Sequence, residues 1–159
     1  MLKKLLLGSM LFCSSLLGAT EVYKCQWNEG LSFQLAIFDG ATEENTPAGI
    51  SVHFSGVLAK YESQAPLLEL ASLEKFKDVD FMINMIKEQI TELNKESDAT
   101  NERTRISLDY YQSLLKIFST ETYLVSTQNS SKTFFLDTTS LSLISYNRKE
   151  LLKGNCNKV

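Results

Sequence analysis

Apolar and polar side chains alternate along the first part of the chain. In residues 31–37 every second residue is apolar, and these residues are Leu31, Phe33, Leu35 and Ile37. Residues 22–27 alternate in the same way, and the turn-forming residues 28–30 (Asn-Glu-Gly) separate the two segments. A period of two is the period of a strand with one buried face, so this region predicts a β-hairpin.

A third alternating segment, residues 50–61, follows a polar segment at 39–49 that contains glycine and proline. The polar segment predicts a loop. The apolar phase of the third segment shifts by one residue at Gly56, which predicts a strand with a β-bulge at that glycine.

The apolar spacing becomes helical between residues 71 and 119, a segment without glycine or proline. Intervals of three and four residues relate the apolar positions Phe76, Val79, Ile83, Ile86, Ile90 and Leu93. A second stripe runs from residue 106 to 118, after a polar stretch at 94–102. Both spacings are typical of amphipathic helices. We expect two antiparallel helices with a turn near 97–101, and one continuous helix is the alternative.

Short alternating segments return in residues 121–159, so strands flank the helical pair on both sides. This order predicts an α+β fold: one antiparallel β-sheet of about six strands, built from both chain ends, with an inserted α-helical hairpin. Its parts are 20–62 (β), 71–119 (helical) and 121–159 (β), within a single domain at 20–159.

The first 19 residues have the layout of a secretory signal peptide. Lys3 and Lys4 precede an apolar run from Leu5 to Leu17, and small residues follow up to Ala19. This order predicts removal of residues 1–19 and export to the periplasm or out of the cell. The run is shorter than the ~20 apolar residues that span a bilayer, so no stable membrane span is expected after cleavage.

Cleavage would also simplify the cysteine content. Cys13 would leave with the signal peptide, and Cys25 and Cys156 would remain near the two ends of the mature chain. A pair of cysteines in an exported domain is typical of a disulfide, here one that joins the first and last strands and closes the fold. No basic residue adjoins either cysteine in a way that indicates a reactive thiol.

Composition limits the classes of partner. Hydrophobic residues make up 43% of the chain, enough for one core. Without Lys3 and Lys4 the chain has 14 basic and 19 acidic residues, a net charge of −5. An acidic domain repels phosphate backbones, so nucleic acid is not expected as a partner.

The sequence offers no recognisable catalytic set. His53, the only histidine, lies between Ser51 and Ser55, but no acid is identifiable that would orient its ring. Two pairs of carboxylates are expected on the solvated surface, and they are Glu43 with Glu44 and Asp78 with Asp80. We therefore expect no catalytic residues, no metal site and no cofactor.

Phe81 and Met85 point away from the main stripe of the first helix and are four residues apart. Such a pair forms a small second apolar patch. It is either a surface for a partner or for self-association, or another part of the chain covers it.

These features together predict a small exported binding module that is not an enzyme. It would act through protein–protein contact with an unknown partner in the cell envelope or outside the cell, as an inhibitor or an envelope accessory factor. One alternative is an oligomeric structural or assembly component driven by the helical hairpin. Another is a hydrolase-type enzyme with an unrecognised site, which would require a concave pocket with perturbed titrating groups.

Overall fold

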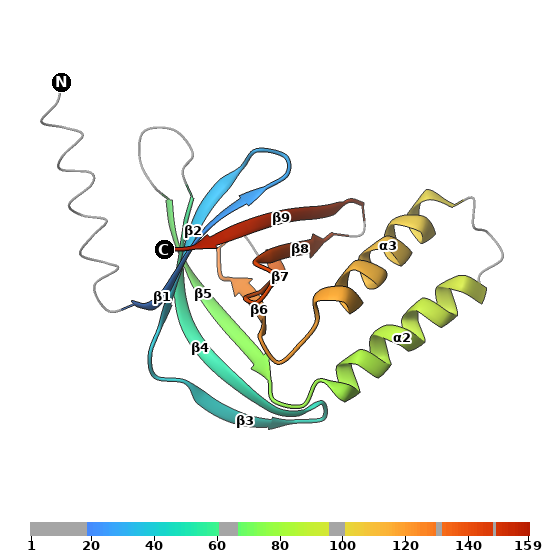
Figure 1. Ribbon diagram of the computed structural model, residues 1–159, viewed down its shortest axis with the longest axis horizontal. Coiled ribbons are helices and arrows are strands. Elements are labelled where there is room, and N and C mark those ends of the chain that lie inside the picture. The colour runs from blue at the N-terminus through green and yellow to red at the C-terminus, as the bar shows by residue number, and fades with distance from the viewer. Residues whose placement is uncertain (1–18, 61–66, 96–100, 130–131, 148) are drawn as a thin grey trace, which may run out of the picture.

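The structure is a computed structural model, and it describes residues 19–60, 67–95, 101–129, 132–147 and 149–159. The predicted signal peptide lies outside this part, apart from residue 19. The described chain forms nine strands and two helices (Figure 1). They are β1 (Ala19–Trp27), β2 (Ser32–Phe38), β3 (Thr42–Thr46), β4 (Gly49–Lys60), β5 (Leu67–Phe76), α2 (Asp80–Lys95), α3 (Glu102–Ile117), β6 (Thr122–Thr127), β7 (Thr133–Asp137), β8 (Ser142–Tyr146) and β9 (Leu151–Lys158).

Eight of the strands close into an antiparallel β-barrel. Apart from the extra strand β3, each strand pairs with the next one along the chain, and β1 pairs with β9 to complete the circle. The prediction of a sheet of about six strands was therefore wrong. Alternation in the sequence indicates single strands, but the pairing that closes a barrel joins residues from opposite ends of the chain, and no local pattern records it.

The extra strand β3 continues the pairing of β2 with the long strand β4. Ile37 of β2 pairs with Gly56, and Thr42 of β3 pairs with His53. In one continuous ladder Thr42 would pair with Ser51, so the pairing with β4 shifts by two residues between β2 and β3. This segment was predicted to be a loop because β3 contains no apolar residue that could mark a buried face.

Strand β5 replaces the beginning of the predicted helical region, which therefore starts at residue 80 and not near residue 71. Its inward residues Glu69, Ala71 and Leu73 are buried, but Leu68 and Leu70 on the outer face are exposed leucines. Because apolar residues lie on both faces of β5, its sequence does not show the alternation that is typical of a strand.

Gly56 lies at a close approach and not at a bulge. The register between β4 and β5 runs without a shift from Ser51 to Lys60. A Cβ atom at Gly56 would lie 2.7 Å from Cδ1 of Leu73 and 2.8 Å from the carbonyl oxygen of Ala36. The apparent change of phase in the sequence therefore reflects a position that has no room for a side chain.

The two helices are separate and pack against each other, as the polar stretch between their apolar stripes predicted. The predicted turn near 97–101 lies outside the described residues, apart from residue 101. Asn101 caps α3, since its side-chain oxygen accepts a hydrogen bond of 3.0 Å from the backbone N–H of Arg103. Helix α3 contacts β8 and β9, and α2 packs on α3, so the hairpin projects from one side of the barrel (Figure 1). No helix in the described part of the chain is long and apolar enough to cross a membrane.

Side chains fill the barrel. The interior cluster includes fully buried residues from many strands, among them Tyr23, Leu35, Leu73, Val125, Leu136 and Leu143. An eight-stranded barrel is just wide enough for side chains to fill. A second cluster outside the barrel holds the hairpin, and its buried members are Phe76, Ile86, Leu114 and Phe118.

The contact between β1 and β9, which we call the seam, contains the predicted disulfide. Cys25 and Cys156 face each other across the seam, and their Sγ atoms are bonded. Gly154 pairs with Trp27, and a side chain at Gly154 would clash with the carbonyl oxygen of Gln26. The first and last strands therefore approach closely at the point where the barrel closes.

We predict that removing the disulfide, by changing both cysteines to serine, lowers the free energy of unfolding by about 5 kcal/mol. The bridge spans a separation of 131 residues, so it strongly restricts the unfolded chain. Urea titration of the oxidised protein and of the double variant measures the difference. A reductant should destabilise the wild type and leave the variant unchanged; equal stability of the two proteins would contradict the prediction.

Candidate functional site

The outer face of the seam carries polar side chains in two rows. Side chains of β1 alternate, so that Tyr23 and Cys25 face the interior and Lys24 and Gln26 face outward. In the first row, Lys24 lies between Gln34 of β2 and Asn157 of β9.

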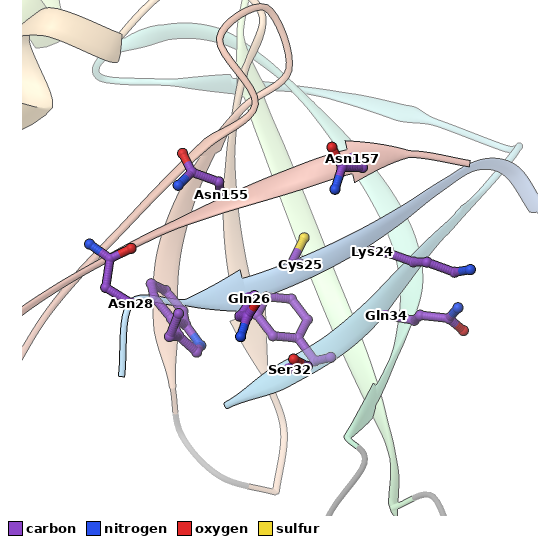
Figure 2. A pocket seen from close by; sticks show the side chains of 10 residues that line it. Lys24, Cys25, Gln26, Asn28, Ser32, Gln34, Asn155 and Asn157 are labelled. Atoms are coloured by element: carbon purple, nitrogen blue, oxygen red, sulfur yellow. The ribbon is translucent and has the colours of Figure 1, made fainter. Parts of the chain in front are cut away.

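The second row has the same arrangement, with Gln26 between Ser32 of β2 and Asn155 of β9. The two rows line an open hollow of about 690 Å³, which Asn28 borders at the end of β1. Figure 2 shows the side-chain amides and the lysine of these rows on the three adjacent strands.

A second hollow of about 340 Å³ lies between α3 and the strands β8 and β9. Ser113 and Lys116 contribute to it from α3, and Lys153 from β9. Asn28 and Asn155 line both hollows. We call the two hollows together the seam groove.

The seam groove has a charge opposite to that of the whole chain. The chain has a net charge of −3, yet three lysines and no carboxylate line the groove. Lys24 and Lys116 form no ion pair within the described part of the chain, whereas Lys153 lies 3.5 Å from Asp109. The side chains of Gln26, Asn155 and Asn157 likewise form no hydrogen bond to described residues. The groove therefore offers donors and acceptors to a ligand.

A cluster of titratable groups closes the end of the barrel where β1 begins. Glu21 accepts hydrogen bonds from Lys158 Nζ at 2.7 Å and from the Tyr23 hydroxyl at 3.1 Å. The Tyr123 hydroxyl lies 3.5 Å from the same carboxylate, and Lys75 Nζ lies 4.2 Å from the centre of the Tyr123 ring.

Burial raises the pKa of Glu21, but the hydrogen bonds and charges of its partners outweigh burial and lower the pKa overall. Burial, followed by the charge of Glu21, raises the pKa of both Tyr23 and Tyr123 well above the ordinary value. Each of these groups has a partner within the cluster, and the bond between Glu21 of β1 and Lys158 of β9 crosses the seam.

His53 does not belong to a catalytic triad. The Ser51 hydroxyl lies 3.1 Å from His53 Nε2, and a Glu44 carboxylate oxygen lies 3.3 Å from the same nitrogen. A triad needs the nucleophile and the acid on different ring nitrogens. Ser51 is also fully buried, which keeps a substrate away from its hydroxyl.

Two of the other carboxylates considered above, Glu43 and Asp78, have structural partners. Glu43 forms an ion pair with Lys77. Asp78 accepts a hydrogen bond of 3.0 Å from the backbone N–H of Asp80 at the start of α2. Within the described residues, no group of three or more histidine, cysteine or acidic side chains could hold a metal ion.

Phe81 and Met85 of α2 do not belong to the apolar cluster that α2 and α3 share. Their side chains are 47% and 43% exposed. The described part of the chain therefore does not cover this patch, and its role as a partner surface stays a prediction.

Sequence reasoning missed the seam groove, although the residues beside the cysteines contain a signal for it. Cys25 lies between Lys24 and Gln26, and Cys156 lies between two asparagines. If the two cysteines bond across adjacent strands and point inward, all four neighbours must point outward on one surface.

The chain was compared with models of known families, with curated proteins and with solved structures, and none of them matches.

We predict that Glu21→Gln lowers the free energy of unfolding at neutral pH by about 1 kcal/mol, because it weakens the bonds to Lys158 and Tyr23. The lowered pKa of Glu21 means that its charge stabilises the fold above the unfolded-state value of about 4.5 and ceases to do so as the pH falls through the folded-state value. Urea titrations from pH 7 to below pH 4 should therefore show the wild type and the variant converging in acid. A difference that is independent of pH would contradict this assignment.

Proposed function

We propose that the protein is an exported, non-catalytic binding module and that a protein partner docks in the seam groove. The observation that carries this proposal is the groove itself: amides, hydroxyls and lysines without a carboxylate, on the surface of an acidic chain. Export is supported by the amino-terminal pattern and by the disulfide, which persists in oxidising compartments.

The chemistry of the groove suits a polar, acidic segment of a protein. A side-chain amide both donates and accepts hydrogen bonds, as a backbone peptide group does. Lys24 and Lys116 add two positive charges that are not neutralised by other described residues. Such charges increase the rate of association with an acidic partner and favour one orientation of docking.

The backbone of the groove is held in place before a partner docks. Most of its side chains lie on strands that the closed barrel and the Cys25–Cys156 bond hold in place. A backbone ordered before binding loses less conformational entropy when a partner docks, so the side chains of the groove carry most of that loss. The described lining residues include no acid and no histidine, so general acid–base catalysis by those groups is not expected there.

Site-specific photo-crosslinking in the native host tests this proposal. A photoreactive residue at Asn157, in the groove, should yield one discrete product with another protein. The same residue at Ser72, which is exposed on β5, serves as the control.

Reversal of charge at Lys24 and Lys116, each changed to glutamate, should abolish the product from position 157, because the groove would then repel an acidic partner. A product that forms equally well at position 72, or that still forms after both charge reversals, would contradict the proposal.

Exposure of Phe81 and Met85 favours a second candidate, in which the helical hairpin drives self-association. Sedimentation equilibrium over a wide range of protein concentration separates the two candidates. The groove proposal predicts the mass of one chain throughout. Assembly through α2 instead requires a mass that increases with concentration in the wild type and remains that of one chain in the variant with both residues changed to serine.

A further inference from the structure

A small apolar cleft opens at the end of the barrel opposite the Glu21 cluster. It has about 60 Å³ of free volume, and side chains from several strand ends line it. Its floor is aromatic: the Trp27 ring centre lies 5.9 Å from that of Phe33 and 5.7 Å from that of Phe134. Leu58 and Leu152 complete the apolar wall.

Apolar surface continues from this cleft onto the rim of the barrel. Leu31 lines the cleft and is 54% exposed. Leu67, which is 53% exposed, pairs with Lys60 at the adjacent strand ends. Leu31 is two residues before the buried Phe33, and Leu67 is two residues before the buried Glu69. Because side chains two residues apart on a strand point to the same side, both leucines face the barrel axis.

The polar residues that line the cleft are Lys60, Lys132, Glu29, Thr127 and Ser145. Lys60 Nζ lies 2.7 Å from Glu69, and this pair is largely buried, with side-chain exposures of 17% and 3%. Lys132 is exposed, and its ammonium group forms no ion pair with described residues. Glu29 is the one acidic residue among those lining the cleft.

We propose that this cleft binds the apolar tail of a medium-chain fatty acid, with the carboxylate of the ligand beside Lys132. An apolar floor with a lysine at the rim complements a molecule that is apolar along its length and anionic at one end. The mouth of a β-barrel is a common place for such sites. This inference does not depend on the proposed partner of the seam groove, since the two surfaces use different lysines.

The size of the cleft and the charge of the chain define the ligand further. The filled interior leaves space for only part of a tail, so the remainder must lie on Leu31 and Leu67. The carboxylate of a single fatty acid meets only the lysine at the rim, whereas an extended anionic membrane surface would also meet the net negative charge of the chain, which favours a free fatty acid over a lipid in a bilayer.

Fluorescence of Trp27, the only tryptophan of the chain, reports directly on this cleft. Titration of the full mature protein with sodium decanoate should give a saturable change in emission. Decanol, which has the same tail without the charge, should bind about three- to five-fold more weakly, as expected for one exposed charge pair. Anionic vesicles without free fatty acid should give no change.

Two surface variants locate the ligand without disturbing the core. Lys132→Glu should weaken decanoate binding by about five-fold or more, and Leu31→Ser should weaken both decanoate and decanol. Lys24→Glu is the matched control, because Trp27 also borders the seam groove. It should leave the titration unchanged.

Three results would overturn the inference: no saturable change with decanoate, equal binding by wild type and Lys132→Glu, or loss of binding in Lys24→Glu alone. The last result would assign the ligand to the seam groove. Failure of the crosslinking experiment would leave this titration unaffected, so the two proposals fail separately.

Discussion

The structure depends on the pairing of its first strand with its last. Five consecutive residues of β1 pair with β9, and the Cys25–Cys156 bond lies at the middle of that ladder. Without this contact both strands would be sheet edges, and the filled interior would open to water. Gly154 permits the close approach, because any side chain there would meet the backbone of β1. The seam therefore joins the two ends of the chain and completes the core.

The sequence predicts most local elements of this fold and the disulfide between its ends, but it does not predict two of the strands or the complete barrel. The β1–β2 hairpin, the two helices and the cysteine pair follow from periodicity or from simple counting. Strand β5 was not predicted because Leu68 and Leu70 are apolar residues on its exposed face. Strand β3 was not predicted because all of its residues are polar. The seam groove could have been inferred from the neighbours of the cysteines. The apolar cleft could not, because its lining comes from strand ends throughout the chain.

Closure of the barrel also produces both proposed binding surfaces. Inward-facing residues of β1 end at Trp27, which forms part of the apolar cleft, and outward-facing residues of the same strand line the seam groove. One strand thus contributes to a polar surface and to an apolar one without any change in backbone conformation. The helical hairpin adds the second wall of the groove through α3 and leaves one side of α2 exposed. The disulfide at the seam holds this arrangement in register.

Native-state hydrogen exchange tests most directly whether the seam holds the fold together. The seam contains hydrogen bonds from Asn28 N–H to the Lys153 carbonyl oxygen at 2.8 Å, and from Val159 N–H to the Val22 carbonyl oxygen at 2.9 Å. In the oxidised protein, amides along β1 and β9 should exchange only by global unfolding, with the same free energy of opening as amides in β6 and β7. Exchange of the seam amides by a local opening of much lower free energy, with β6 and β7 still protected, would contradict this account.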